Sequence, residues 1–309
     1  MDLARAVGLA LGFAADRALG DPRRGHPVAG FGRAAGALER ALWADSRGRG
    51  AVFTTVAVGL PVVAAARVER RSGLLARAGW TALATWAVLG GRSLESEAHA
   101  VGDLLGPDLG PARQRLTHLV GRRTDELDEA GIVRAVVESV AENTSDAVVA
   151  PLWWGGVAGL PGLVGYRAAN TLDAMVGHRT ERLLRFGWAS ARLDDVLNLV
   201  PARVAAAHAA ALAPLVGGRP LDALRAWERD APAHPSPNAG PVEAAFAGAL
   251  GLRLGGETVY ASGVEQRPRL GDGREAAAPD VARATRLARL VDRGALAVAV
   301  VVALRRRRG

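Results

Sequence analysis

Three carboxylates stand four residues apart just before a long apolar tract. They are Glu138, Glu142 and Asp146 in the stretch VVESVAENTSDAVVAPLWWGG, and Asn143 lies beside them. In a helix this spacing places all three on one face. No Arg follows at helical spacing to neutralise them, and hard oxygen ligands suit Mg²⁺ that also binds substrate phosphates. The stretch predicts a metal site at Glu142, Asn143 and Asp146; the alternative is a solvated helix face.

A second polar group follows, in YRAANTLDAMVGHRTERLLRFGWASARLDDVLN. Asn170 and Asp173 share a helix face. Asp194 and Asp195 form another cluster with Asn198, directly ahead of an apolar stretch. Polar groups so close to such a segment cost free energy unless they are paired or used. Nearby cations could pair them or bind an anionic ligand: Arg167, Arg179 and Arg192.

A third group is the loop HPSPNAGPVEAAFAGAL. Two prolines stiffen the loop, and a helix is expected to begin at Gly240–Pro241. The free N–H groups of a helix N-terminus bind anions. His234, Ser236 and Asn238 add side-chain donors, so the loop predicts a phosphate subsite; the alternative is an ordinary capping loop. No P-loop, dinucleotide-binding GxGxxG or HExxH motif is present, so a nucleotide must be held in another way.

The elements that carry these groups are expected to be helices, because Ala, Leu and Arg dominate and strand-like alternation is scarce. Only the uncharged tract Ala147–Tyr166 reaches the length of about 20 residues that a spanning helix needs. Shorter tracts could span if flanking Arg side chains snorkel. They are Gly50–Ala66, Ala78–Gly91, Val204–Gly218 and Gly294–Leu304. Their recurrence, and the Trp residues near them, favour an integral membrane protein over a soluble helical one.

The two ends of the chain fit this interpretation. The C-terminal run GALAVAVVVALRRRRG resembles a stop-transfer signal and predicts a cytoplasmic C-terminus. The N-terminal stretch MDLARAVGLALGFAADRALGD carries an early Asp2 and no convincing cleavage site, so we interpret it as a retained first helix rather than a signal peptide.

We therefore predict an all-α, multi-pass membrane protein with a single membrane-embedded domain over residues 1–309. Polar segments 92–146 and 219–293 separate apolar tracts and are expected to form the active site, with loops concentrated in the second. The tract Ala147–Tyr166 contains five Gly and two Pro residues. It predicts either a broken helix that lines a cavity or a tightly packed, kinked helix.

Composition excludes several classes of protein. Without cysteine the chain has neither disulfides nor thiolate metal sites. The net charge is +8, yet all 39 basic residues are Arg, a bias that indicates codon usage rather than a polyanion partner. Since basic residues are not interleaved with aromatic ones, we expect no nucleic-acid partner.

Together these residues resemble the adenosylcobinamide-phosphate synthase family (CobD/CbiB) of the late cobalamin pathway. The matching pieces cover most of the chain in family order: DRALGDPRRGHPV, ESVAENTSDAVVAPLWW, YRAANTLDAMVGH, FGWASARLDDVLNLVPAR and HPSPNAGPVEAAFAGALGLRLGG. Two positions depart from the family pattern. The chain has GRRT, with Arg123, in place of a GRDT-like motif, and SDA, with Ala147, in place of SDG.

The resemblance implies an enzyme of the cell membrane that joins adenosylcobyric acid to aminopropanol phosphate as an amide, with ATP as co-substrate and Mg²⁺. Its expected partners are this corrinoid, the amine phosphate, membrane lipid and other late-pathway corrinoid enzymes. On this basis we expect the chemistry to depend on Glu138, Glu142, Asp173, Asp194 and Asp195. The substrates would be bound by His26, Arg167, Asn170, Arg179, His234, Ser236 and Asn238. A carboxylate or His would accept the proton of the amine. The alternative is a non-catalytic membrane sensor or permease, which would need polar residues inside its spans.

Overall fold

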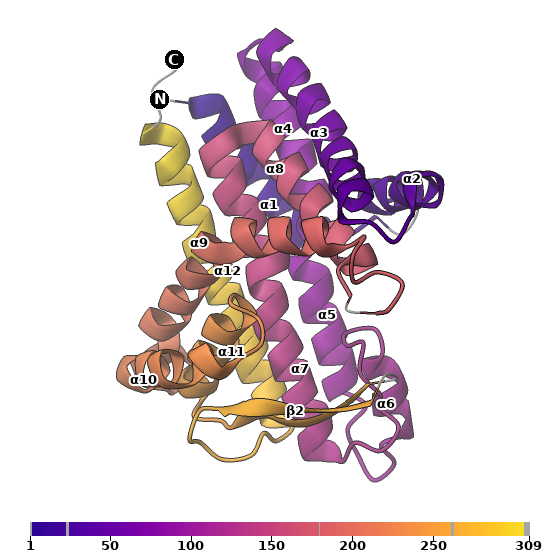
Figure 1. Ribbon diagram of the computed structural model, residues 1–309. Helices are drawn as coiled ribbons and strands as arrows, with labels where there is room; N and C mark the ends of the chain where they lie inside the picture. The colour runs from indigo at the N-terminus through magenta and orange to yellow at the C-terminus, as the bar shows by residue number, and fades with distance from the viewer. Residues whose placement is uncertain (1, 23–24, 179, 261–262, 306–309) are drawn as a thin grey trace. The chain divides into compact units, whose positions relative to one another are not determined.

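The computed structural model describes residues 2–22, 25–178, 180–260 and 263–305. It is 74% helical, as the sequence predicts. The chain forms two compact units (Figure 1). The first comprises Met1–Gly90, Ala150–Asn198 and Leu296–Gly309, and the second comprises Gly91–Val149 and Leu199–Ala295. The prediction of a single membrane-embedded domain stays a prediction.

The first unit is a helical bundle. Its complete helices are α1 (Leu3–Leu19), α2 (Pro27–Leu42), α3 (Arg47–Arg71), α4 (Leu74–Val88) and α8 (Ala150–Val176). It also contains the start of α9 (Trp188–Leu212) and the end of α12 (Pro279–Arg305). The expected first helix is therefore present as α1, with Asp2 accepting a hydrogen bond from the Arg5 amide at its N-terminus.

Small residues allow α1 and α4 to approach each other closely. A Cβ atom added at Gly8 would lie 2.5 Å from Cβ of Thr81, and one at Gly12 would lie 2.4 Å from Cβ of Thr85. Gly8 and Gly12 are four residues apart and so lie on one face of α1. Close packing through small residues at this spacing is typical of helices that associate in a membrane.

Helix α8 is interrupted by a kink inside the apolar tract, which fits both sequence alternatives, a broken helix and a kinked one. Gly159 has φ 71° and ψ −146°, values that only glycine adopts readily. The break leaves backbone carbonyls without helical partners, and Arg5 donates to one of them, Gly156 O, at 3.3 Å. Arg5 also contacts Glu69 at 3.3 Å, so an ion pair lies beside the break.

The second unit surrounds a helix that is buried along its whole length, α11 (Ala239–Leu250). The other helices of this unit are α5 (Gly91–Gly102), α6 (Gly110–Leu116), α7 (Glu129–Thr144) and α10 (Pro220–Asp230). A π-helical turn, Ser145–Val149, follows α7, and short 3₁₀ turns occupy Ala213–Val216 and Ala231–Ala233. The unit also contains the first part of α12.

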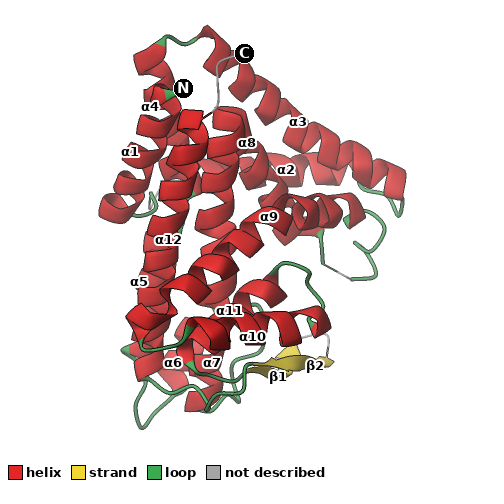
Figure 2. Cartoon of the chain, turned by 90° about the vertical axis from the view of Figure 1, so that its left-hand side faces the viewer, coloured by secondary structure: helices red, strands yellow, loops and turns green. Residues whose placement is uncertain are grey.

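A small hairpin corrects the all-α prediction. Strands β1 (Leu254–Tyr260) and β2 (Gly263–Leu270) pair antiparallel within the polar segment 219–293 (Figure 2). Leu254 pairs with Leu270, and the register shifts before Gly256 pairs with Arg267. At the shift, Gly255 has φ 75°, and a Cβ atom there would lie 2.0 Å from Pro268 O, so the position accepts only glycine.

Three helices are long and apolar enough to cross a membrane: Arg47–Arg71, Glu129–Val176 and Trp188–Val216. They contain two of the five apolar tracts and most of a third, Val204–Gly218. Within the described part of the chain, α12 is not among them, although its apolar end was expected to act as a stop-transfer segment. Arg306–Arg308, which complete the predicted Arg cluster, lie outside the described residues.

Candidate functional site

A buried group of charged and polar side chains lies in the second unit, and we call it the charge cluster. Its members come from the loop before α7, from α7, from the loop before α11, from α11 and from β2. They are Arg122, Glu138, His234, Glu243 and Arg267, whose side chains are between 2% and 20% exposed. Titratable groups gathered and buried in this way are typical of functional sites.

Glu138 connects three parts of this unit. Its Oε2 lies 2.7 Å from Nη1 of Arg122, and its Oε1 accepts a hydrogen bond of 2.8 Å from the Gly255 amide. Helical spacing alone predicts that Glu138 is unpaired, because no Arg follows it at that spacing. The structure corrects this, since the partner Arg122 comes from the loop that precedes α7.

Glu243 is the second deeply buried carboxylate of the cluster. It lies on α11 and is 2% exposed. Burial raises its pKa well above the usual range, and the negative charges of Glu138 and Glu142 act in the same direction. The positive charges of Arg267 and Arg122 oppose this shift. A carboxyl group in this environment holds its proton at a pH where exposed glutamates have lost theirs.

His234 lies beside Glu243, with Nε2 3.9 Å from Oε2. Its Nδ1 lies 3.1 Å from the Ser236 amide and 3.2 Å from the Ser236 carbonyl oxygen. That carbonyl already accepts from the Gly240 amide, so we assign Nδ1 as the acceptor of the Ser236 N–H and place the imidazole proton on Nε2. Burial lowers the pKa of His234, which keeps the ring neutral at pH 7.

The hairpin supplies the second cation of the cluster. Arg267 on β2 donates a 2.6 Å hydrogen bond to the hydroxyl of Tyr260 on β1, and its guanidinium lies 5.8 Å from the centre of that ring. These contacts hold Arg267 in place, where its charge acts on Glu243. The unexpected sheet therefore has a clear role, because it positions both Arg267 and the Gly255 amide that binds Glu138.

The predicted Mg²⁺ ligands lie around the end of α7. Glu142 is exposed, and Asn143 and Asp146 are partly exposed. Asn143 Nδ2 donates to Ser139 O at 2.9 Å, while Asp146 lies in the π-helical turn, which changes its angular position relative to α7. Among the residues that the structure describes, no group of three or more His, Asp or Glu side chains could hold a metal ion by itself. The donor types still fit Mg²⁺ that is shared between one or two carboxylates and phosphate oxygens.

In the first unit, α8 and α9 bring together part of the second predicted group. Asp194 accepts from Asn170 at 3.3 Å and from Asn198 at 3.0 Å, and Tyr166 donates to Asn198 Oδ1 at 2.8 Å. Asp194 is only 9% exposed, so these hydrogen bonds satisfy a buried carboxylate. Asp195 lies close enough to Asp173 for their charges to interact, and both are partly exposed.

The predicted binding residues of the first unit have different surroundings. His26 caps α2, with Nδ1 accepting from the Val28 amide at 3.1 Å. Arg167 lines an apolar cavity of about 320 Å³ together with Phe31, Trp80 and Leu160. Arg179 lies outside the described residues. Their predicted roles in substrate binding stay predictions.

The loop before α11 begins the helix close to the predicted position. The Ser236 hydroxyl accepts from the Asn238 amide at 3.3 Å and from the Ala239 amide at 3.1 Å, so it satisfies two amides at the start of α11, whose N-cap residue is Asn238. Asn238 Oδ1 accepts from Arg203 at 3.3 Å. Arg203 and His234 line a cavity of about 400 Å³ with Trp227 and four prolines. The cation Arg203 thus lies at the predicted phosphate subsite, although some of the side chains predicted to bind phosphate already form hydrogen bonds within the loop.

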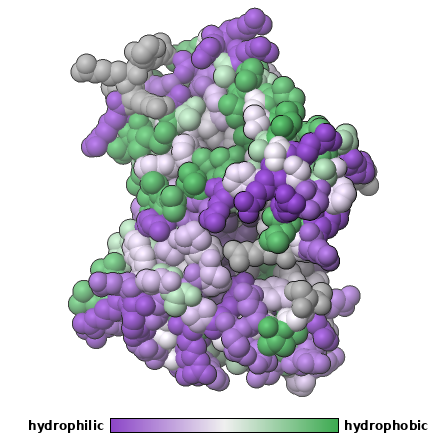
Figure 3. Space-filling view, viewed as in Figure 1, coloured by the Kyte–Doolittle hydropathy of each residue, from purple (hydrophilic) through white to green (hydrophobic). Residues whose placement is uncertain are grey.

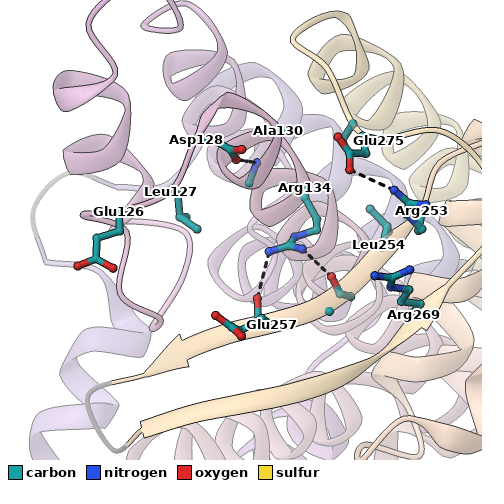
Figure 4. A pocket seen from close by; sticks show the side chains of 14 residues that line it. Glu126, Leu127, Asp128, Ala130, Arg134, Arg253, Leu254, Glu257, Arg269 and Glu275 are labelled. Carbon is teal, nitrogen blue, oxygen red and sulfur yellow. Dashed lines mark hydrogen bonds and ion pairs between the residues drawn. The ribbon is translucent and has the colours of Figure 1, made fainter.

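Another cavity of the second unit, of about 420 Å³, lies where α7 meets β1 (Figure 4). None of the predicted site residues lines it. Arg134 spans it, donating to Gly255 O at 2.8 Å and to Glu257 O at 3.1 Å, and Arg253 is paired with Glu275 at 3.1 Å. Because Arg134 is used to hold β1 and Arg253 is paired with Glu275, we place the chemistry at the charge cluster and not in this cavity.

Three members of the cluster were not predicted from the sequence: Arg122, Glu243 and Arg267. Only Glu243 gives a clear signal in the sequence, because it is the one charged residue in the apolar run AGPVEAAFAGAL. A lone ionisable residue in such a run is buried at a cost and is often functional.

The helical fold and the buried charges indicate a polar functional site. Comparison with known proteins identifies the family. The CobD/Cbib protein family matches residues 9–288. A protein named cobalamin biosynthesis protein CobD from Mycobacterium tuberculosis (strain CDC 1551 / Oshkosh) is 51% identical over 304 residues, which cover 98% of this chain and 97% of that protein. Proteins with the same name from Chromobacterium violaceum and Rhodobacter capsulatus are 46% and 42% identical; the alignments cover 94% and 98% of this chain and 93% and 98% of those proteins.

The chain therefore belongs to the CobD/CbiB family of cobalamin biosynthesis. This confirms the family predicted from the sequence motifs. No solved structure matches the chain.

Proposed function

We propose that the protein is an ATP-dependent amide ligase that joins adenosylcobyric acid to aminopropanol phosphate and forms adenosylcobinamide phosphate. Membership in a cobalamin-biosynthesis family supports a step in this pathway. The observation that carries the proposal is the charge cluster, where buried Glu138 and Glu243 lie among the cations Arg122 and Arg267. Such a site offers both a proton acceptor and stabilisation of developing negative charge.

The chemistry requires activation of a carboxylate. ATP would transfer its terminal phosphoryl group to the acid, giving an acyl phosphate and ADP. Mg²⁺ would neutralise the phosphates, with Glu142 and Asp146 as its protein ligands. Arg122 and Arg267 would stabilise charge on the leaving phosphate. The phosphate of the amine substrate would bind near Arg203, His234 and Asn238.

We further propose that the protein is a multi-pass protein of the cell membrane with a cytoplasmic C-terminus. The three long apolar helices support this, as do exposed apolar side chains on α1, α3 and α4, among them Leu3, Leu11, Leu60, Leu75 and Trp80. In Figure 3, green apolar patches lie over the first unit. The protein should stay in the membrane pellet after alkaline carbonate washing, and its release would contradict this location.

The assay of the proposed activity uses protein purified in detergent, adenosylcobyric acid, aminopropanol phosphate and MgATP. We expect adenosylcobinamide phosphate, identified by mass, with one ADP formed for each product molecule. Omission of either the acid or the amine must abolish the product. A purified, folded protein that binds corrinoid but forms no amide under these conditions would favour the non-catalytic alternative.

A further inference from the structure

The side chains of Glu243 and His234 face each other deep in the second unit. The two side chains are 2% and 3% exposed. The Nε2–Oε2 distance of 3.9 Å is too long for a direct hydrogen bond. Nε2 has no hydrogen-bond partner among the described residues, although a buried donor without one is costly. The gap therefore lies between two polar atoms that can bind the same hydrogen-bonding group.

A cavity borders the His234 side of this pair. His234 lines the cavity of about 400 Å³ that Arg203 and Trp227 also border. A ligand in that cavity lies against His234, one side chain away from Glu243. The prolines around the cavity stiffen its wall, so the imidazole is held in a fixed position.

Charged side chains from three elements act on Glu243, and the neutral His234 faces it from a fourth. Glu138 and Glu142 come from α7, Arg122 from the preceding loop and Arg267 from β2, while His234 faces it from the loop before α11. Burial and the two glutamates raise the pKa of Glu243, and burial lowers the pKa of His234. These shifts make Glu243 more basic and His234 less basic than the same side chains in water.

Resting on the proposed ligase function, we propose that Glu243 and His234 are the acid–base pair that removes the proton from the attacking amine. The substrate ammonium group, R–NH₃⁺, gives one proton to the Glu243 carboxylate and becomes R–NH₂. The amine nitrogen forms a bond to the acyl carbon as the bond from that carbon to the phosphate oxygen breaks. The second nitrogen proton leaves with the phosphate as HPO₄²⁻, and Glu243 returns its proton to solvent. His234 is the positioning residue, because its Nε2–H faces the Glu243 carboxylate that accepts the proton.

The test compares two amine acceptors. Hydroxylamine is uncharged at pH 7 and needs no base before it attacks an acyl phosphate, whereas aminopropanol phosphate carries an ammonium group. Glu243→Gln should lower kcat with aminopropanol phosphate about 10²- to 10⁴-fold. Hydroxamate formation from adenosylcobyric acid, MgATP and hydroxylamine should stay within about threefold of wild type. Equal losses with both acceptors, or equal retention, would overturn the assignment.

Matched variants separate this role from a structural one. Glu95→Gln also removes a buried carboxylate of the second unit, one that pairs with Arg289, and should keep the wild-type ratio of the two activities. If Glu243→Gln does not fold, Glu243→Asp serves instead. It should move the acidic limb of the pH profile of kcat/KM with aminopropanol phosphate and leave the hydroxylamine profile unchanged. An unmoved limb in a folded Glu243→Asp protein contradicts the assignment.

The same experiment distinguishes failure of this inference from failure of the proposed function. If wild-type protein forms neither amide nor hydroxamate, the ligase function itself is wrong. If wild-type protein forms both and Glu243→Gln also forms both at wild-type rates, the ligase function stands and the acid–base pair is wrong.

Discussion

The ion pair between Arg122 and Glu138 should be a main determinant of stability in the second unit. Both side chains are buried, at 8% and 2% exposure, and their nearest charged atoms are 2.7 Å apart. Arg122→Met keeps most of the side-chain volume but leaves the Glu138 carboxylate buried without its cation. Removal of one partner of such a pair costs about 3–5 kcal/mol.

The most local reporter is hydrogen exchange of β1, because the Gly255 amide donates to Glu138 at 2.8 Å. In Arg122→Met the protection of the β1 amides should fall about 10²- to 10⁴-fold, since each 1.36 kcal/mol is a factor of about ten. Arg122→Met/Glu138→Gln should recover part of this loss, because glutamine can still accept from Gly255 and carries no charge.

Arg123 provides the matched control, because it is the next residue and pairs with Asp125 at the surface. Arg123→Met should leave the protection of β1 near the wild-type level. If Arg122→Met changes protection less than about threefold, or no more than Arg123→Met does, the argument that this buried pair stabilises the unit is wrong.

Three further predictions concern other parts of the chain. Glu142→Gln should raise the Mg²⁺ concentration needed for half-maximal activity and lower turnover by orders of magnitude; near-normal turnover at ordinary Mg²⁺ would make Glu142 part of a solvated face. Gly159→Ala should destabilise the first unit by more than about 1 kcal/mol in thermal unfolding, because its Cβ atom would lie 2.4 Å from Glu69 Oε1 and φ is 71°; an unchanged Tm would contradict the strained break. Burial would raise the pKa of Asp280, but hydrogen bonds from Arg274, the Ala277 amide and Arg283 outweigh it and lower the pKa. Its stabilising contribution is therefore present above the pKa of an unfolded Asp and lost as the pH falls through the depressed folded value, so the acid-unfolding curve of Asp280→Asn should be flatter there than that of wild type.

The helices could be predicted because their signals are local. Apolar tracts such as Gly50–Ala66 and Ala147–Tyr166 mark α3 and α8, and the glycines and prolines of the second tract indicate the break at Gly159. The hairpin was not predicted, because β1 and β2 are short strands in a segment rich in Gly, Pro and charge. Their pairing depends on contacts with other elements more than on their own propensity.

The candidate site could be predicted only in part, for a related reason. Helical spacing relates Glu138 to Glu142, but it gives no information on Arg122, which reaches Glu138 from a loop. Likewise Glu243 is close to Glu138 only after α11 packs in the second unit, and Arg267 depends on a hairpin that was not expected. The family motifs, and not the spacing of single residues, indicate cobalamin biosynthesis.

The most direct test of the central claim follows an oxygen atom. Adenosylcobyric acid labelled with ¹⁸O in its carboxylate is incubated with aminopropanol phosphate, MgATP and the purified protein. If the acid is activated by phosphoryl transfer, the released phosphate must contain one ¹⁸O for each adenosylcobinamide phosphate formed. Amide formation that releases unlabelled phosphate would contradict the proposed ATP-dependent acyl-phosphate chemistry, and product formed without ATP would contradict the ligase assignment itself.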